Sequence, residues 1–204
     1  MNLPNKLTIL RILLVPLFIL FSVGLPDFAS KLLSVIGLGA FVNSFSDFIS
    51  NGGLIASGVV FIISFSTDML DGYIARKRNL VTDFGIFMDP IADKLLVTAA
   101  LIVLASRNVI GAWIPVIIIS REFIVTGLRL LASKKGIALA AGGFGKAKTV
   151  IQSVALAFLL FGNFRIAFLS SINAGGIILN VALVFTVASG VDYIIKNRTL
   201  FDNN

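Results

Sequence analysis

The stretch DMLDGYIARKRNLVTDFGIFMDPIAD, residues 68–93, determines how the rest of the chain is interpreted. Four of its aspartates form two pairs, Asp68 with Asp71 and Asp89 with Asp93, at helical spacings of three and four residues. A long apolar run leads into the first pair, and another follows the second. Carboxylates embedded in such segments are energetically costly, so they indicate a functional site.

The spacing of the four aspartates predicts that they lie at matching depths on two antiparallel helices. With a turn near Leu80, Asp71 and Asp89 are each nine residues from the turn, and Asp68 and Asp93 are twelve and thirteen residues away. At 1.5 Å of rise per residue, all four carboxylates then fall about 13–20 Å from the turn.

Small residues share the predicted carboxylate faces, Gly72 and Ala75 on the first helix and Gly85 on the second, so a ligand can approach closely. Four acids that converge at low dielectric need a compensating charge. We therefore expect a pair of divalent cations, which can clamp the attacking and leaving oxygens of a phosphoryl displacement. Two alternatives are an ion-pair cluster with Lys94 and Arg121, and the cation pathway of a transporter.

The composition indicates a polytopic membrane protein. Of 204 residues, 57% are hydrophobic and 13% charged, and the mean hydropathy is +1.01. The net charge of +7 lies mostly in short loops, so we interpret it as topology signals and anion contacts rather than a nucleic-acid surface. Cysteine and histidine are absent, which excludes disulfides, zinc sites built from these residues and a histidine base. Oxygen ligands favour Mg²⁺ or Mn²⁺, and an aspartate is the best candidate for a general base.

The apolar runs predict an all-α integral membrane protein, with six transmembrane helices around a polar cavity that faces the cytoplasm. We expect the whole chain, residues 1–204, to be one membrane domain. Residues 25–53 read as a loop with a surface helix. The expected spans are residues 7–23, 54–76, 83–105, 109–132, 142–161 and 175–195.

The basic residues predict the orientation of these spans in the cell membrane. Ten lie on the side of the two termini: Lys6, Arg76, Lys77, Arg78, Lys134, Lys135, Lys146, Lys148, Lys196 and Arg198. Three lie on the opposite side: Lys31, Arg107 and Arg165. The positive-inside rule therefore places both termini and the aspartates at the cytoplasm.

The aspartate motif resembles the signature of the CDP-alcohol phosphatidyltransferase family. The matching pattern is Asp68-x-x-Asp71-Gly72-x-x-Ala75-Arg76, then eight residues, then Gly85-x-x-x-Asp89-x-x-x-Asp93. The resemblance implies a six-span helical membrane protein, usually a homodimer, in which an alcohol displaces CMP from a CDP-linked lipid.

The same resemblance implies roles for the individual residues of the motif. Asp68, Asp71 and Asp89 would bind the two metal ions, and Asp93 would be shared between a metal and proton abstraction. The residues expected to line the CDP site are Gly72, Ala75, Arg76 and Gly85.

The N-terminal pattern Pro4-Asn5-x-Leu7-Thr8-x-x-Arg11 is also similar to the beginning of this family's members. Asn5 and Thr8 are therefore candidates to contact the nucleotide. The alternative is an ordinary helix start, with Asn5 as the cap and Arg11 reaching the lipid headgroups.

Two further patterns resemble the branch of the family whose acceptor is glycerol 3-phosphate. They are Arg121-Glu122-Phe123-Ile124-Val125-Thr126-Gly127-Leu128-Arg129 and Gly145-Lys146-x-Lys148-Thr149-x-x-Gln152. The resemblance implies CDP-diacylglycerol and glycerol 3-phosphate as substrates. The expected contacts to the acceptor phosphate are Arg121, Lys135, Lys146 and Lys148.

The charges around Glu122 agree with an anionic acceptor. Arg121 and Arg129 share a helix face with this single acid, which leaves a surplus cation suited to a phosphate. In the alternative, Glu122 neutralises one arginine and the other extends to the headgroups. Asp192, near the end of the last span, is expected to pair with a lysine or arginine. Alternative functions are transfer to serine, an inositol phosphate or a second lipid, and divalent-cation transport.

Overall fold

The computed structural model describes residues 3–78, 83–134, 143–162 and 174–197, and these residues are helical or in short connections, with no strand among them. Within the helices, the side chains of residues 3, 4, 6, 68–78, 83–87, 89, 90, 93, 134 and 143–147 lie outside the description. The helices are α1 (Leu3–Val23), α2 (Asp27–Leu33), the π-helical turn η1 (Ser34–Leu38), α3 (Gly39–Arg78), α4 (Asp83–Ser106), α5 (Trp113–Lys134), α6 (Gly143–Leu160) and α7 (Ala174–Lys196).

The six long helices, α1 and α3 to α7, each contain most of one predicted apolar run, which confirms the all-α prediction for the described residues. The prediction for residues 25–53 was wrong in its main part. That stretch forms α2, η1 and the beginning of α3, and α3 continues for 40 residues to Arg78.

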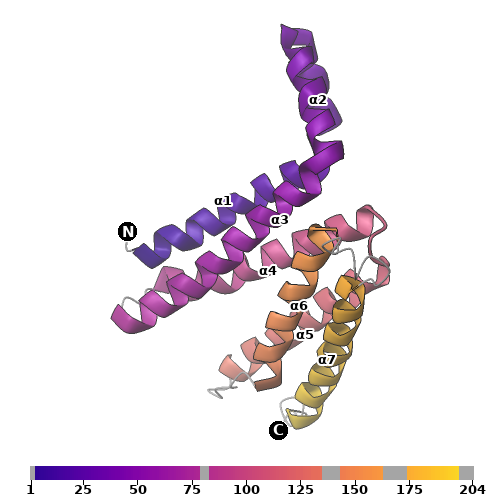
Figure 1. Ribbon diagram of the computed structural model, residues 1–204. Coiled ribbons are helices and arrows are strands. Elements are labelled where there is room, and N and C mark those ends of the chain that lie inside the picture. Colours follow the sequence, from indigo (N-terminus) through magenta and orange to yellow (C-terminus); the bar gives the residue numbers. More distant parts are fainter. Residues whose placement is uncertain (1–2, 79–82, 135–142, 163–173, 198–204) are drawn as a thin grey trace. The chain divides into compact units, whose positions relative to one another are not determined.

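The contacts divide the chain into two compact units, residues 1–103 with 160–162 and residues 104–159 with 163–204. In the first unit, α1 and α3 pack together in antiparallel directions (Figure 1). The rings of Phe18 and Phe61 lie 6.5 Å apart between the two helices. Gly53 permits the closest approach, because a Cβ atom there would lie 2.4 Å from the carbonyl oxygen of Phe21. A larger residue would therefore force the two backbones apart.

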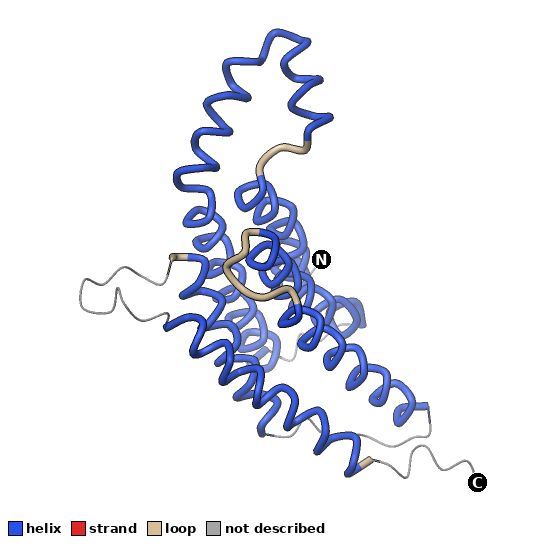
Figure 2. The backbone as a smooth tube through the Cα atoms, turned by 90° about the vertical axis from the view of Figure 1, so that its right-hand side faces the viewer, coloured by secondary structure: helices blue, strands red, loops and turns tan. Residues whose placement is uncertain are grey.

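A helical hairpin, residues 27–51, precedes the part of α3 that packs on α1. Its two arms are α2 and the first residues of α3, and the chain turns back between them at the top of the tube in Figure 2. Gly37 makes this turn with a φ of +87°, in the left-handed region that glycine adopts without a steric penalty.

In the second unit, α5 packs against α7, and α6 contributes side chains to the same unit. Their buried apolar residues form the unit's core. They include Ile118, Val125 and Leu128 of α5, Leu156 and Leu159 of α6, and Leu179 and Leu183 of α7.

Two helical stretches of the described residues, Asp27–Thr67 and Ala174–Lys196, are long and apolar enough to cross a membrane by length and composition. Three shorter apolar stretches accompany them, Leu7–Val23, Lys94–Ser106 and Lys148–Leu160. The stretch Asp27–Thr67 covers α2, η1 and most of α3, and the other stretches lie in α1, α4, α6 and α7. The structure therefore contains the helices on which the prediction of six membrane spans rests, and the number of spans stays a prediction.

Candidate functional site

The four aspartates of the central motif lie within continuous helices. Asp68 and Asp71 belong to the last third of α3, and Asp89 and Asp93 belong to the first half of α4. This confirms the helical spacing from which the carboxylate faces were predicted. The carboxylate groups themselves lie outside the described side chains, so the metal site stays a prediction.

Several other predicted site residues also lie outside the described side chains. For Gly72, Ala75 and Arg76 in α3, Gly85 in α4 and Lys146 in α6, only membership of the helix is described. Lys135 lies outside the described residues altogether. Their roles rest on the sequence.

The N-terminal candidates lie on α1. Thr8 and Arg11 are both buried, with 1% of each residue exposed, and Asn5 is half-buried. The alternative in which Arg11 extends to the lipid headgroups is therefore wrong. A guanidinium buried in this way requires acceptors inside the protein. Thr8 and Arg11, three residues apart, occupy one inward-facing side of α1.

Glu122 is the centre of a charged cluster in the second unit. Its Oε1 accepts a hydrogen bond from Nη1 of Arg121 at 3.2 Å and another from Nζ of Lys148. The side chain of Lys148 is 3% exposed, that of Arg121 15% and that of Glu122 30%. Two predicted phosphate contacts, one from α5 and one from α6, are thus brought together at a single carboxylate.

The second cation at Glu122 is Lys148, whereas the sequence pattern suggested Arg129. The guanidinium carbon of Arg129 lies 5.8 Å from the ring centroid of Tyr193, within the range of a cation–π contact, and the residue is exposed. A wheel drawn for α5 alone cannot detect a partner on α6. Asp192 pairs with Lys196 at 2.9 Å, which confirms the expectation of a basic partner.

Helix α7 positions Arg121 through two small residues that the sequence interpretation missed. Nη2 of Arg121 donates to Oγ of Ser189 at 3.0 Å, and Ser189 donates to the carbonyl oxygen of Thr186 at 3.1 Å. A Cβ atom at Gly190 would lie 3.0 Å from Cγ of Arg121, so the arginine packs directly on the glycine. The sequence Ala188-Ser189-Gly190 in an apolar helix was the available signal, because small residues mark close helix packing in membranes.

Arg121 and Lys148 share the carboxylate of Glu122. Nε of Arg121 is buried and has no hydrogen-bond partner among the described residues. A partly buried guanidinium with an unsatisfied donor suits an anionic ligand such as a phosphate.

The sequence profile of the CDP-alcohol phosphatidyltransferase family matches residues 1–188, and the chain belongs to this family. Members of the family are membrane-associated and generally use divalent metal ions. The donor set of the aspartate motif fits such an ion, because four carboxylates at helical spacing in α3 and α4 offer only hard oxygen ligands.

Curated relatives point to one branch of the family. The chain is 43% identical over 201 residues to the CDP-diacylglycerol–glycerol-3-phosphate 3-phosphatidyltransferase of Bacillus subtilis (strain 168), covering 96% of this chain and 95% of the relative. The protein of the same name from Rickettsia typhi is 35% identical, with 98% of this chain and 99% of the relative covered. A probable phosphatidylglycerophosphate synthase of Mycobacterium tuberculosis (strain H37Rv) is 33% identical, covering 96% of this chain and 81% of that protein.

Proposed function

We propose that this protein transfers the phosphatidyl group of CDP-diacylglycerol to glycerol 3-phosphate, releasing CMP and forming phosphatidylglycerophosphate. The names of relatives at 35–43% identity over nearly the whole chain support both substrates. The structural observation that carries the proposal is the partly buried guanidinium of Arg121, whose Nε has no hydrogen-bond partner among the described residues, because such a donor suits an acceptor that carries its own phosphate.

The aspartate motif is proposed to hold two divalent cations, Mg²⁺ or Mn²⁺. Asp68, Asp71 and Asp89 would be the main ligands, with Asp93 contributing to one ion. When bound, the ions would neutralise the pyrophosphate of CDP-diacylglycerol and stabilise the departing CMP.

Asp93 is proposed to be the general base. Its carboxylate takes the proton of the acceptor hydroxyl while that oxygen attacks the β-phosphorus of CDP-diacylglycerol. The new phosphorus–oxygen bond forms as the bond from that phosphorus to the oxygen of CMP breaks, so the electron pair leaves with CMP. The absence of histidine and cysteine from the chain supports an aspartate in this role.

The nucleotide is proposed to lie against residues of α1, α3 and α4. Gly72, Ala75 and Gly85 lack bulk and allow the CDP group close to the helices, and Arg76 supplies a positive charge. Asn5 and Thr8 are the proposed polar contacts from α1.

The acceptor phosphate is proposed to bind Arg121 and Lys148, together with Lys135 and Lys146. Glu122 and Ser189 orient Arg121, since each accepts a hydrogen bond from one terminal nitrogen of its guanidinium group. This fixation lowers the conformational entropy that Arg121 would otherwise lose when it binds the phosphate.

The proposed topology has six spans, with both termini and the active site at the cytoplasm, and the enzyme is proposed to be a homodimer, as the family resemblance implies. The ratio of ten basic residues to three supports the orientation. Cysteines introduced at Lys77 and at Arg165 should react with a membrane-impermeant reagent from opposite sides. Reaction from the same side would exclude the six-span topology.

The proposed reaction is tested with purified protein, CDP-diacylglycerol and Mg²⁺ or Mn²⁺. Glycerol 3-phosphate, serine and an inositol phosphate are supplied separately, and CMP release is measured. Faster CMP release with serine or the inositol phosphate would agree with the family assignment but would contradict glycerol 3-phosphate as the acceptor. Ion flux into liposomes without CMP release would favour the divalent-cation transporter.

A further inference from the structure

The hairpin of residues 27–51 is amphipathic along both of its arms. In the α3 arm, an ideal helix places the apolar residues within an arc of about 120° and the polar residues on the remaining surface. The apolar residues are Phe41, Val42, Phe45, Phe48 and Ile49. The polar residues are Asn43, Ser44, Ser46, Asp47, Ser50 and Asn51.

The short arm, formed by α2 and η1, repeats the same division. Phe28, Leu32, Val35 and Ile36 share one side of the arm. The polar residues of the other side are Asp27, Ser30, Lys31 and Ser34. Two consecutive helices with the same pattern indicate that the hairpin as a whole has one apolar and one polar side.

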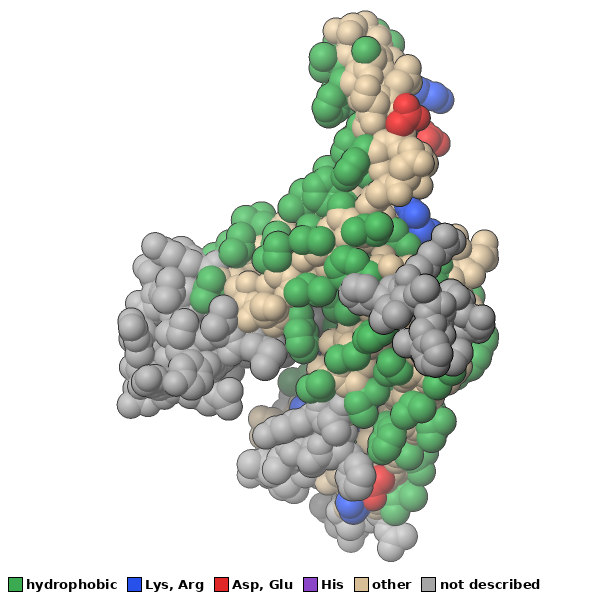
Figure 3. All heavy atoms as spheres, viewed as in Figure 1, with side chains coloured by type: hydrophobic (Ala, Val, Ile, Leu, Met, Phe, Trp, Pro, Cys, Tyr) green, Lys and Arg blue, Asp and Glu red, His purple; other side chains and the backbone are tan. Residues whose placement is uncertain are grey.

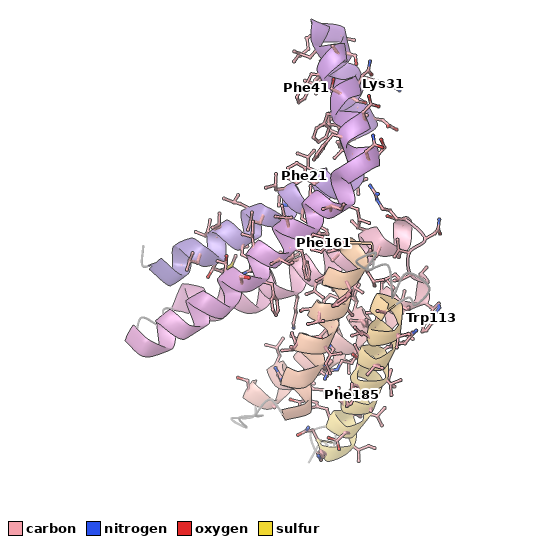
Figure 4. The ribbon with its side chains drawn as sticks, viewed as in Figure 1. Phe21, Lys31, Phe41, Trp113, Phe161 and Phe185 are labelled. Carbon is pink, nitrogen blue, oxygen red and sulfur yellow. The ribbon has the colours of Figure 1, made fainter. Side chains whose placement is uncertain are left out.

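Much of the apolar side is exposed within this chain, whereas Val42 and Ile49 are buried. The exposed fractions are 75% for Phe28, 84% for Val35 and 58% for Phe41. Hydrophobic side chains follow one edge of the hairpin in Figure 3, and its charged side chains follow the opposite edge. The labelled residues Phe41 and Lys31 point in opposite directions from the hairpin (Figure 4).

A row of aromatic rings joins this apolar side to α1. The ring centroids of Phe41 and Phe45 are 6.1 Å apart, those of Phe45 and Phe48 6.4 Å, and those of Phe48 and Phe21 6.2 Å. Beyond Phe21, the same side of α1 continues with the exposed residues Leu17, Leu13 and Leu10. The apolar side of the hairpin is therefore continuous with the outer surface of the α1–α3 pair.

Helix lengths show that the hairpin extends past the end of α1. With 21 residues, α1 is about 31 Å long, which equals a hydrocarbon core of about 30 Å, whereas the 40 residues of α3 extend for about 60 Å. The end of α1 meets α3 at Ile49, since a Cβ atom at Gly24 would lie 3.6 Å from Cγ2 of Ile49. The α3 residues before Ile49 thus lie beyond the length that spans the hydrocarbon.

We propose that the hairpin of residues 27–51 lies in the membrane–water interface at the Val23 end of α1, with its phenylalanine side in lipid and its polar side in water. A straight projection into water would expose the phenylalanine row. Helix α3 changes direction where it leaves α1 (Figure 1), and the adjacent glycines Gly52 and Gly53 are a typical position for such a bend.

The charges of the hairpin favour lipid as the occupant of its apolar side. Asp27, Lys31 and Asp47 are exposed, and two acids against one base give a net charge of −1. All three lie on the polar side, so the apolar side can enter lipid without desolvating a charge. Binding by apolar area alone is expected to be insensitive to salt and to anionic lipid.

The test uses the full-length protein reconstituted in phosphatidylcholine vesicles. Because the chain has no cysteine, single-cysteine variants can carry an environment-sensitive fluorophore at one defined position. Phe41→Cys and Phe48→Cys report on the apolar side, and Asn43→Cys and Asp47→Cys on the polar side. Leu13→Cys, at the exposed middle of α1, is the matched control for a position deep in the hydrocarbon.

The apolar-side labels should lie at a depth of about 5–10 Å. They should therefore be quenched more strongly by a lipid that is spin-labelled near the headgroup than by one labelled near the end of the acyl chain. The Leu13 label should show the reverse order, and the polar-side labels should respond to aqueous iodide. Three results would overturn the proposal. The first is quenching of the apolar-side labels by iodide, and the second is stronger quenching of these labels by the deep spin label than by the shallow one. The third is protection of these labels from both the lipid spin labels and iodide, combined with self-quenching between labelled copies of the protein. CMP release by each variant verifies that it is folded.

Discussion

Replacement of Arg121 by alanine is predicted to weaken the use of glycerol 3-phosphate selectively. The change removes one charge-assisted contact to the acceptor phosphate and leaves the ion pair between Lys148 and Glu122 in place. The loss of such a contact costs about 1.5–3 kcal/mol, or roughly a 10- to 150-fold decrease in kcat/KM for glycerol 3-phosphate.

The assay measures CMP release at saturating CDP-diacylglycerol while glycerol 3-phosphate is varied, and then with the two substrates exchanged. The KM for CDP-diacylglycerol should change little, because the proposed nucleotide and metal residues lie on other helices. Arg121→Lys should recover only part of the activity, since lysine lacks the planar fork that reaches Glu122 and Ser189 together.

Arg129→Ala is the matched control, because it removes an arginine from the same helix. Arg129 is exposed and lies over the ring of Tyr193, so its loss should leave kcat/KM for glycerol 3-phosphate close to the wild-type value. Wild-type kinetics in Arg121→Ala, or equal losses in the two alanine variants, would refute the assignment of Arg121 to the acceptor phosphate.

Three further groups of substitutions test the packing and the motif. Gly190→Ala should displace Arg121, whose Cγ would lie 3.0 Å from the new Cβ; an off-rotamer shift costs about 0.5–1.5 kcal/mol, or roughly 2- to 12-fold in kcat/KM for glycerol 3-phosphate. Gly127→Ala is the control, since a Cβ there meets no atom within 4 Å, and equal effects would contradict the packing argument. Gly53→Ala should separate α1 from α3 at the carbonyl of Phe21 and destabilise the protein by about 1–3 kcal/mol, seen as a lower thermal midpoint in detergent; an unchanged midpoint would contradict the close approach. Asp→Asn at Asp68, Asp71 or Asp89 should abolish CMP release without loss of the folded protein, and chelation should do the same reversibly; activity retained in all three variants would exclude the proposed metal site.

The helical framework could be predicted from the sequence because its apolar runs are long and interrupted by polar loops. The beginnings and ends of α4 and α7 agree with the predicted runs to within one residue. The hairpin could not be recognised in this way. Its serine, asparagine and aspartate residues resemble a loop when read in order, and become one side of a helix only when a period of 3.6 residues is applied.

The contacts around Glu122 could not be predicted from the pattern of a single helix. The sequence predicts Arg121 from the family resemblance and from the single acid, Glu122, that shares its helix face. Lys148 is 26 residues from its partner Glu122, and Ser189 is 68 residues from its partner Arg121. Such contacts depend on how α5, α6 and α7 pack, which the pattern of a single helix does not contain. The burial of Arg11 likewise depends on its neighbours in the first unit.

The most direct test of the proposed function is a competition between acceptors for one donor. Purified protein is given CDP-diacylglycerol, Mg²⁺ or Mn²⁺ and equal concentrations of glycerol 3-phosphate, serine and an inositol phosphate, and the lipid products are separated. Phosphatidylglycerophosphate should be the dominant product, formed in equal amount to the CMP released. A dominant phosphatidylserine or inositol phospholipid, or CMP release without any new lipid, would contradict the proposed function.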